Sequence, residues 1–281
     1  MGSPLLAIVR LTAYLLATMA LIPVQTVLPR CGWRHGSRFA RCYHRLCLRL
    51  LGFSVEVIGV PVPGRPTLFV ANHMSYLDIT VFGSVILGSF VAKSEVAGWP
   101  LFGLLAKLQR TVFVDRKRGS TAQQRDGISE RLAAGDDLIL FPEGTSGDGI
   151  HVLPFKSALF SAADRTIDGE PLTVQPVSLA YTRLDGIPIG RGRIPFFAWY
   201  GDMDLGAHLW RVAGLGHTSI ELTFHPPVTL AALGSRKALA AHCHAVVAGG
   251  VAASLAGRRP AAYISSQAAV ADAAIADVQT Q

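Results

Sequence analysis

The 281-residue sequence has few charged residues, and this shortage narrows the class of protein that it can encode. Charged residues make up 16% of the chain and hydrophobic residues 50%, with a mean hydropathy of +0.37. Such a composition is apolar for a soluble protein but too polar for a transporter with many membrane spans. The length suits one α/β domain, alone or with a short membrane element, and it allows a core that needs no disulfides.

Cysteine is also scarce, and the four cysteines show no spacing typical of a metal site. Cys42 and Cys47 are five residues apart in a helix-like stretch, so their side chains point to different sides and are poorly placed for a disulfide. We interpret the cysteines as small apolar side chains of a protein in a reducing, cytoplasmic compartment.

The sequence lacks the common nucleic-acid-binding motifs, although its formal net charge is +7. It has no RNP-type aromatic motif, no Cys/His finger and no basic heptad arm. A basic surface of this kind otherwise attracts an anionic membrane or an anionic substrate. We therefore expect an anionic membrane surface as a partner, and no nucleic acid.

The N-terminal part of the chain contains one apolar run without a charge, at residues 11–28. As a helix it would be roughly 27 Å long, against about 30 Å for the hydrocarbon core of a bilayer. Pro23, Gln25 and three threonines make it a marginal span, so a bilayer crossing and a re-entrant anchor both remain open. A cleaved signal peptide is the least favoured alternative, because no A-x-A-like site follows and the main basic cluster lies after the run.

A series of arginines follows this run at intervals of three or four residues: Arg30, Arg34, Arg38, Arg41, Arg45 and Arg49. The spacing predicts a basic stripe on a helix at 38–51 whose opposite face is apolar, and Gly32 and Gly36 are expected to interrupt the helix before it. We favour a helix at an anionic membrane surface over the alternative, the solvated face of a core helix. The same arginines predict that the following domain lies on the cytoplasmic face of the cell membrane.

Strand-like and helix-like segments alternate through the rest of the chain. Strands are expected at 53–59, 67–71, 90–93, 111–114, 137–141, 172–181 and 219–224, and helices at 77–87, 98–108, 121–134 and 235–255. This alternation predicts an α/β fold with a mixed, partly parallel sheet flanked by helices, preceded by an N-terminal membrane-anchoring helical segment. We divide the chain into an anchor with a basic amphipathic helix (1–52), a main domain (53–258) and a tail expected to be disordered (259–281).

The first chemical signal is His73 followed by Asp78, after the expected strand at 67–71. A histidine with a carboxylate partner is the standard general-base pair, because the carboxylate fixes the tautomer and stabilises the imidazolium. Residues five apart on one helix lie about 140° apart, so His73 must lie in the turn and Asp78 on the helix after it. Ser75 and Asp78 also fit the start of a capping box, which leaves a purely structural role open.

Three further segments end an expected strand or lie within one. Val114-Asp115-Arg116 offers a guanidinium that can grip an anion, or is only a solvated basic loop. Phe141-Pro142-Glu143-Gly144-Thr145-Ser146 offers a glycine, a threonine and backbone N–H groups to phosphate oxygens, or is only a strand-ending turn. Gln175-Pro176-Val177 interrupts an apolar strand, which indicates an edge strand or a bulge beside a site. In α/β sheets the ligand crevice lies beyond the carboxyl ends of the strands.

Taken in order, N-H-x-x-x-x-D, V-D-R, F-P-E-G-T and the proline-containing strand resemble the four blocks of the glycerolipid acyltransferases. The similarity is strongest to the bacterial 1-acylglycerol-3-phosphate acyltransferases and covers most of residues 50–225. It implies an acyltransferase domain that moves a fatty acyl group from acyl-CoA or acyl-acyl carrier protein to the hydroxyl of 1-acyl-sn-glycerol-3-phosphate. The product is phosphatidic acid, and neither a cofactor nor a metal is implied.

The resemblance also implies a role for each block. His73 is the expected general base, which takes the proton of the lipid hydroxyl, and Asp78 orients it. Arg116 is expected to bind the acceptor phosphate, with Lys93 as a second cation, and Pro176 to shape the acyl-donor side. The implied substrate-binding residues are Lys93, Arg116, Glu143, Gly144, Thr145 and Pro176.

Other readings remain open. Close relatives within the family acylate lyso-ornithine lipid, and the segment Trp199–Leu205 does not decide between the acceptors, since its aromatics fit a core and its acids fit the cap of a helix at 205–213. A metal-dependent hydrolase built on His73, Asp78 and Glu143 is a further class, disfavoured by the spacing. A non-catalytic binder of anionic lipid, held by the arginines, is the last, and only turnover separates it from the enzyme.

Overall fold

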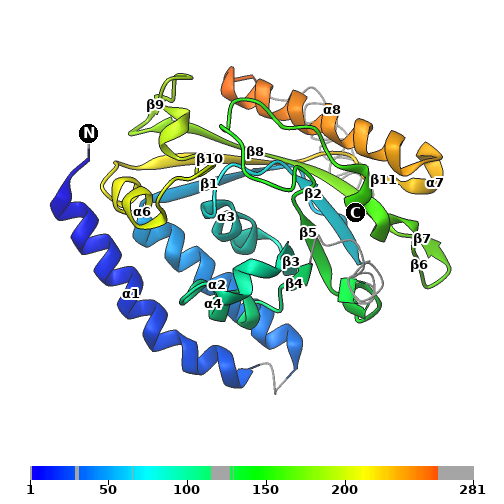
Figure 1. Cartoon of the computed structure of the whole chain (residues 1–281), viewed down its shortest axis with the longest axis horizontal. Coiled ribbons are helices and arrows are strands. Elements are labelled where there is room, and N and C mark those ends of the chain that lie inside the picture. The colour runs from blue at the N-terminus through cyan, green and yellow to red at the C-terminus, as the bar shows by residue number, and fades with distance from the viewer. Residues whose placement is uncertain (1, 29–31, 65, 115–126, 129, 259–281) are drawn as a thin grey trace, which may run out of the picture.

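The computed structural model describes residues 2–28, 32–64, 66–114, 127–128 and 130–258, without the side chains of residues 33–35. The predicted tail at 259–281 and Arg116 lie outside the described residues. Figure 1 shows a central sheet with one long helix on one face and a layer of helices on the other. The predicted α/β class, with a mixed sheet flanked by helices, is confirmed.

The sheet has nine strands within the described part of the chain, and its main path is β1-β10-β8-β2-β5-β3-β4. From β8 to β4 neighbouring strands are parallel, whereas β1 and β10 are parallel to each other and antiparallel to β8. These strands are β1 (Phe53–Ile58), β2 (Thr67–Ala71), β3 (Gly88–Lys93), β4 (Val112–Val114), β5 (Asp137–Leu140), β8 (Thr173–Leu184) and β10 (Thr218–Phe224). The short strands β9 (Ile187–Pro188) and β11 (Val228–Thr229) pair with β8, and β6 (Thr166–Ile167) and β7 (Glu170–Pro171) pair with each other.

The helices form two layers (Figure 1). The long helix α8 (Arg236–Leu255) covers one face of the sheet with η3 (Ser157–Asp164) and α7 (Leu230–Leu233). The opposite layer contains α1 (Pro4–Val27), α2 (Trp33–Leu51), α3 (Leu77–Val85), η2 (Ser94–Gly98), α4 (Phe102–Leu108) and α6 (Leu205–Ala213). The short turn η4 (Ile194–Phe196) precedes α6. The side chains of Asp204 and Ser235 cap α6 and α8 by accepting N–H bonds, as expected of such residues.

Strand β2 shows how the two layers share one sheet. All of its residues are buried, and alternate side chains point to opposite faces. Phe69 belongs to the core beneath α2 and α3, whereas Leu68 and Val70 belong to the core beneath α8. A parallel strand that is covered on both faces reads as a continuous apolar run, which is how this strand was recognisable in the sequence.

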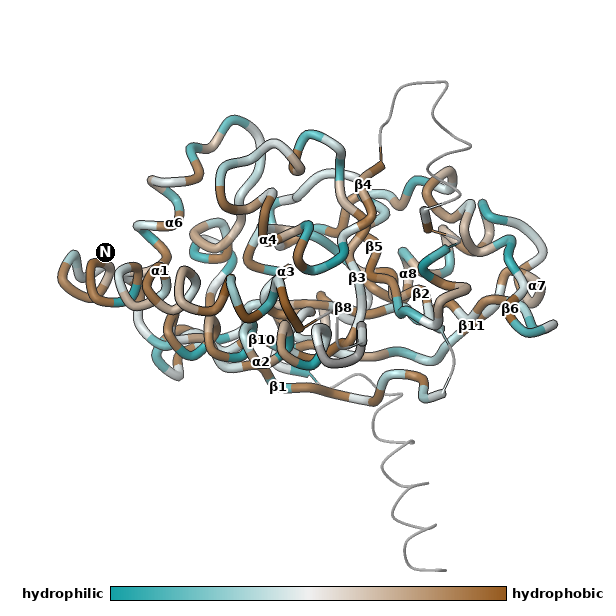
Figure 2. Tube along the Cα trace, turned by 90° about the horizontal axis from the view of Figure 1, so that it is seen from below, coloured by the Kyte–Doolittle hydropathy of each residue, from teal (hydrophilic) through white to brown (hydrophobic). Residues whose placement is uncertain are grey.

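Helix α1 is longer than the predicted apolar run and is fastened to the domain near both ends. Arg10, which precedes that run, donates to the carbonyls of Ala213 (3.2 Å) and Leu215 (2.6 Å). Gln25, which makes the run marginal as a span, is buried and donates to the carbonyl of Leu108 (3.1 Å). The remaining face of α1 carries exposed apolar side chains, which make the helix a candidate membrane anchor. Figure 2 shows hydrophobic positions recurring along this helix.

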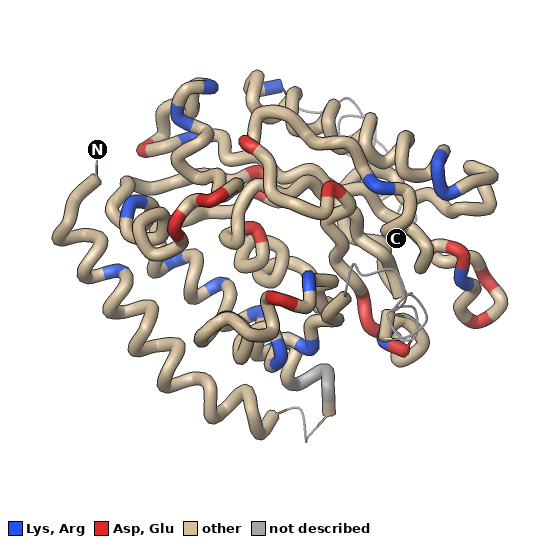
Figure 3. Tube along the Cα trace, in the orientation of Figure 1, with Lys and Arg blue, Asp and Glu red and all other residues tan. Residues whose placement is uncertain are grey.

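Helix α2 carries the arginine stripe, but its other face belongs to the protein core. Its side chains pack mainly against α3 and α1, and Cys47 and Leu51 are fully buried. Arg38, Arg45 and Arg49 are exposed, and Figure 3 shows basic positions recurring along this helix. The expectation that Gly36 interrupts the helix is wrong, because α2 begins directly after Gly32 and continues without a break through Gly36.

The proline in β8 does not mark an edge strand. Pro176 pairs with Val70 of β2 on one side, and on the other its carbonyl accepts the N–H of His225 (3.0 Å). The ladder on that side changes partner here, because Val177 pairs with the end of β10 and Val174 with β11. The alternative of an edge strand is therefore wrong, and the proline lies where the ladder is interrupted and no N–H is needed.

Candidate functional site

The catalytic candidates lie in the turn between β2 and α3. His73 follows the buried end of β2, and Asp78 is in the first turn of α3. The Nδ1 atom of His73 is 2.9 Å from Oδ2 of Asp78. A carboxylate only accepts hydrogen bonds, so Nδ1 carries the hydrogen and Nε2 presents a lone pair. The sequence argument, with histidine in the turn and aspartate on the helix, is confirmed as geometry.

Asp78 is completely buried and has a full set of hydrogen bonds. Its Oδ2 atom accepts from His73 and also from the backbone N–H groups of Met74 (2.8 Å) and Ser75 (3.0 Å). Its Oδ1 atom accepts from the hydroxyl of Tyr181 (3.2 Å). Burial and the nearby carboxylate raise the pKa of Tyr181 well above its ordinary value, so this hydroxyl keeps its proton and donates.

The two readings of Ser75 and Asp78 are therefore compatible. The Asp78 carboxylate accepts from the backbone N–H of Ser75, as the acid of a capping box does, while it also holds the His73 ring. The Ser75 hydroxyl stays close to the start of α3 and accepts from Leu77 (3.4 Å). One carboxylate thus fixes both the helix start and the imidazole.

Glu143 holds the backbone of the histidine rather than facing the solvent. Its Oε1 accepts from the N–H of His73 (2.7 Å) and its Oε2 from the N–H of Leu153 (2.9 Å). Burial raises the pKa of Glu143 to about 7, against the opposing effect of these two N–H bonds. On the other side, Gly147 donates its N–H to the carbonyl of His73 (2.9 Å). Both backbone groups of His73 are therefore bound by the segment 143–147, which follows β5.

The rest of that segment forms a turn beside the histidine. Gly144 has a positive φ of 71° and its N–H closes the turn on the carbonyl of Phe141 (3.0 Å), a conformation that favours glycine. The ring of Phe141 stacks on the ring of His73, with centroids 4.3 Å apart. Thr145 and Ser146 line the adjoining cavity, and the Ser146 hydroxyl donates to the carbonyl of Trp199.

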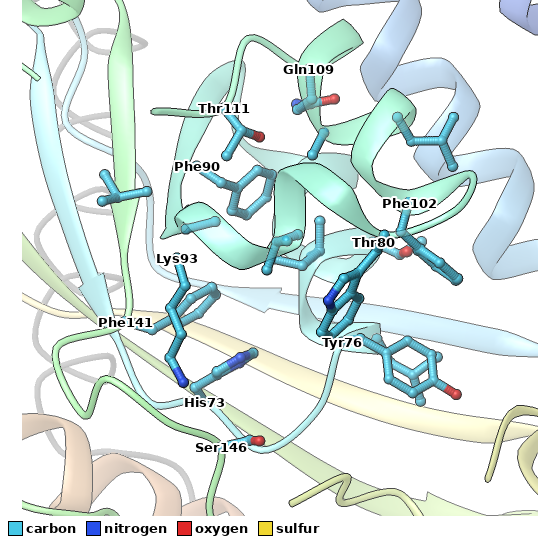
Figure 4. A pocket seen from close by; sticks show the side chains of 18 of the residues that line it. His73, Tyr76, Thr80, Phe90, Lys93, Phe102, Gln109, Thr111, Phe141 and Ser146 are labelled. Carbon is cyan, nitrogen blue, oxygen red and sulfur yellow. The ribbon is translucent and has the colours of Figure 1, made fainter. Parts of the chain in front are cut away.

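The other predicted substrate-binding residues differ in their placement. Lys93 ends β3, and Figure 4 shows its side chain extending toward His73 in the cavity. Pro176 is buried in β8 and is not among the described residues that line the cavity. The structure thus brings Lys93, Glu143 and the Gly144 turn to the surroundings of His73.

A large apolar cavity opens beside His73. Its volume is about 910 Å³, and its walls come from α1, α2, α3, β3 and α4. Strand β3 lines it from Phe90 to Lys93, and near the other end of this strand Gln109 donates to the carbonyl of Gly88 (3.2 Å). Figure 4 shows Gln109 at the end of the cavity away from His73.

The inner end of the cavity is polar but uncharged. The amide of Gln109 donates to Gly88, so its oxygen faces Nε2 of His44 at 3.0 Å, and this nitrogen must carry a hydrogen. Burial lowers the pKa of His44 to about 4, which keeps the ring neutral. These contacts tie α2 to the sheet around the inner end.

Sequence reasoning missed several residues that shape the site. Asn72 joins β2 to β8 with two bonds, accepting from the N–H of Leu179 (2.8 Å) and donating to its carbonyl (2.9 Å). Tyr181 reaches Asp78 from the same part of β8, and Phe141 supports the His73 ring. Asn72 stands next to the histidine in the first block, which is a usable signal, whereas nothing in the local pattern indicates Tyr181.

Comparisons with known proteins point to one family. A family model described as Acyltransferase matches residues 54–180. The chain is 44% identical over 229 residues to the lyso-ornithine lipid O-acyltransferase of Brucella abortus (strain 2308), covering 79% of this chain and 85% of that protein. It is 34% identical over 180 residues to the 1-acyl-sn-glycerol-3-phosphate acyltransferase of Neisseria gonorrhoeae, covering 63% and 66%. The crystal structure of PlsC, the 1-acyl-sn-glycerophosphate acyltransferase of Thermotoga maritima, has a similar fold, with a TM-score of 0.56, 22% identity and coverage of 86% and 96%.

Proposed function

The chain belongs to the acyltransferase family, and from this premise we propose that it transfers a fatty acyl group from a thioester donor to the free hydroxyl of a lyso-ornithine lipid. The observation that carries the proposal is the His73–Asp78 pair at a large apolar cavity. A lipid hydroxyl needs a base, and an acyl chain needs an apolar space, and both are present in one place.

His73 acts as the general base in this proposal. Its Nδ1–H is bound to Asp78, so Nε2 takes the proton of the acceptor hydroxyl while the hydroxyl oxygen attacks the thioester carbonyl. The carbon–sulfur bond of the tetrahedral intermediate then breaks, and the imidazolium returns the proton to the leaving thiolate. Asp78 stabilises the imidazolium between the two steps, as a buried carboxylate at 2.9 Å can do.

The cavity receives the acyl chain in this proposal. It extends along β3 from Lys93 to Phe90, away from His73, between walls that are mostly apolar. Burying each methylene contributes about 0.8 kcal/mol, so a long chain is held firmly without a polar contact. Acyl-CoA or acyl-acyl carrier protein is the donor that we propose, and no cofactor takes part.

We propose lyso-ornithine lipid as the acceptor in preference to 1-acyl-sn-glycerol-3-phosphate because the relatives that carry its name are more similar to this chain. The relatives named lyso-ornithine lipid O-acyltransferase are 36–44% identical to this chain, whereas the Neisseria 1-acyl-sn-glycerol-3-phosphate acyltransferases are 34% identical over a shorter alignment. The second acceptor stays a candidate, since those relatives carry that name. For it, Lys93 and Arg116, the latter outside the described residues, are the proposed phosphate-binding cations.

Helix α1 supports the proposal that the protein lies at the membrane surface. Bonds from Arg10 and Gln25 hold it along the domain, which favours a helix that dips into one leaflet over one that crosses alone. The exposed arginines of α2 would then face anionic lipid, on the cytoplasmic face of the cell membrane. The apolar face of α1 and the arginine stripe thus act together in this proposal.

A panel assay tests the proposed function. Purified protein is given lyso-ornithine lipid or 1-acyl-sn-glycerol-3-phosphate, each with acyl-CoA or acyl-acyl carrier protein, with and without a chelator. We expect ester formation with lyso-ornithine lipid that survives chelation, and a loss of about 10²- to 10⁴-fold in His73→Ala. His151→Ala is the matched control, because this exposed histidine also contacts an aspartate (Asp148, 3.1 Å) but does not line the cavity.

Three results would count against the proposal. Near-normal acyl transfer by His73→Ala would remove the histidine from the chemistry. Binding to vesicles without any thioester consumption by the wild type would favour the lipid-binding alternative. Turnover that disappears with the chelator would instead favour metal-dependent chemistry.

A further inference from the structure

The loop at residues 199–204 is attached directly to the catalytic turn. The N–H of Trp199 donates to the carbonyl of Met74 (2.8 Å), the residue after His73. The carbonyl of Trp199 accepts from the hydroxyl of Ser146, and its indole N–H donates to the carbonyl of Met203 (2.9 Å). The loop is therefore bonded to both segments that carry the candidate site.

Aromatic packing fixes the loop further. The Trp199 ring lies edge-on to Tyr76 and to Trp99, with ring centroids 5.8 Å apart in both pairs. Tyr76 precedes α3, and Trp99 follows η2, the turn that continues from Lys93. The loop thus joins the surroundings of His73 to the segment that begins with Lys93, and it has little freedom to move away from either.

The loop presents one carboxylate that is not used by the fold. Tyr200 and Gly201 line the cavity, and Asp202, the next residue along the chain, is exposed. Asp204, the other acid of the loop, caps α6 by accepting from the N–H of Ala207 (2.7 Å). Asp202 forms no ion pair within the described residues.

We propose that the 199–204 loop is the headgroup wall of the acceptor site, with Asp202 receiving the free amine of an ornithine headgroup and Lys93 receiving its carboxylate. The proposal rests on the proposed function, because it assigns groups to its acceptor. An ornithine unit attached to a lipid through one amine keeps a carboxylate and a second amine. A carboxylate and a cation on the two segments joined by Trp99 and Trp199 match this pair of charges.

The same arrangement disfavours a phosphate headgroup. A phosphate monoester carries two negative charges and gains from Lys93 but is repelled by Asp202. Discrimination between acceptors would then come from a repulsive contact as well as an attractive one. Neutralising Asp202 is expected to weaken binding of the zwitterionic acceptor, and to leave binding of the anionic acceptor unchanged or make it tighter.

Kinetics with a modified acceptor test the assignment. The acceptors are lyso-ornithine lipid, the same lipid with its free amine acetylated, and 1-acyl-sn-glycerol-3-phosphate. For Asp202→Asn we expect kcat/KM to fall about tenfold with the native lipid, mainly through KM, as the loss of one charged hydrogen bond predicts. With the acetylated lipid, which the wild type already uses less well, the variant should equal the wild type.

Two control variants make the result specific. Asp204→Asn removes the other acidic charge of the loop but keeps the cap of α6, because asparagine caps helices about as well as aspartate, so any loss it causes should be the same for both forms of the lipid. Glu95→Gln removes a carboxylate that lines the cavity, two residues after Lys93. A loss that depends on the amine in Glu95→Gln, and not in Asp202→Asn, would overturn the assignment to Asp202.

The remaining outcomes separate this inference from the proposed function. If the wild type acylates lyso-ornithine lipid and Asp202→Asn is unchanged, or loses the same factor with both forms of the lipid, the inference fails and the function stands. If the wild type does not acylate lyso-ornithine lipid at all, both fail. An amine-dependent loss confined to Asp202→Asn supports both.

Discussion

Replacing Asp78 with asparagine separates the charge of the catalytic pair from its geometry. An asparagine oxygen in the position of Oδ2 still accepts from His73, Met74 and Ser75. Its amide then faces the hydroxyl of Tyr181, which can rotate and accept. We therefore expect Asp78→Asn to fold, with a loss of about 1–2 kcal/mol in the free energy of unfolding.

The expected loss of rate follows from the imidazolium. When His73 becomes charged, a buried carboxylate at 2.9 Å turns their contact into a charged hydrogen bond, whereas asparagine leaves a neutral acceptor. Charged hydrogen bonds contribute about 1.5–3 kcal/mol, and a pair of charges at 4 Å with an effective dielectric constant of 20 contributes about 4 kcal/mol. At about 1.4 kcal/mol for each factor of ten, kcat should fall between about 10-fold and 10³-fold. KM should change little, because Asp78 is fully buried and does not line the cavity.

The assay is steady-state acyl transfer with the acceptor that the panel identifies, with the melting temperature measured in the same detergent. Tyr181→Phe is the matched control, because it removes one bond to Asp78 and keeps both the charge and the histidine contact. It should lose less than about 10-fold in kcat. A folded Asp78→Asn protein whose kcat stays within about threefold of the wild type would refute the reasoning.

Two further predictions concern the support of the site and the anchor. Burial raises the pKa of Glu143 from 4.5 to about 7, so the folded state holds its proton more tightly than the unfolded state does. The protonated Glu143 side chain therefore contributes to the free energy of unfolding below about pH 4.5, by up to roughly 3 kcal/mol, and this contribution is lost as the pH rises to about 7. Glu143→Gln should lack this pH dependence when unfolding is measured from about pH 4 to 8. Arg10→Met should loosen α1, since it loses the bonds to Ala213 and Leu215, and amide hydrogen exchange in α1 should become faster while exchange in β2 is unchanged.

The first of these two would be contradicted by parallel stability curves for the wild type and Glu143→Gln across that pH range. The second would be contradicted by unchanged exchange in α1. A faster exchange throughout the sheet would instead mean that Arg10 stabilises the whole domain rather than the position of one helix.

Much of the fold was predictable because its signals are local. The continuous apolar runs of β2 and β5 reflect strands that are buried on both faces, and the helix signal at 235–255 reflects α8. The relation of His73 to Asp78 was also local, since it needs only the pitch of a helix and a preceding turn. The catalytic and binding roles of the site residues stay predictions until the assays are done.

The contacts that complete the site depend on strand register, which no local pattern gives. Tyr181 reaches Asp78 only because β8 is parallel to β2 and continues past its end. The burial of Glu143 depends on the same kind of long-range packing, and its motif pointed to the substrate rather than to the backbone of His73. Gly36 shows the reverse error, because packing keeps it in a helix that its propensity opposes.

The two hydrogen bonds that segment 143–147 makes to the backbone of His73 also limit where insertions and deletions can occur in the chain. Glu143 accepts from the N–H of His73 and Gly147 donates to its carbonyl, so the number of residues between Glu143 and Gly147 is fixed by the distance between these two backbone groups. A single insertion there must break one bond, whereas an insertion in a surface loop between β2 and β5 leaves both intact. Homologues should therefore differ freely in the number of residues between the His73 motif and the Glu143 motif. The number of residues from Glu143 to Gly147 should be constant.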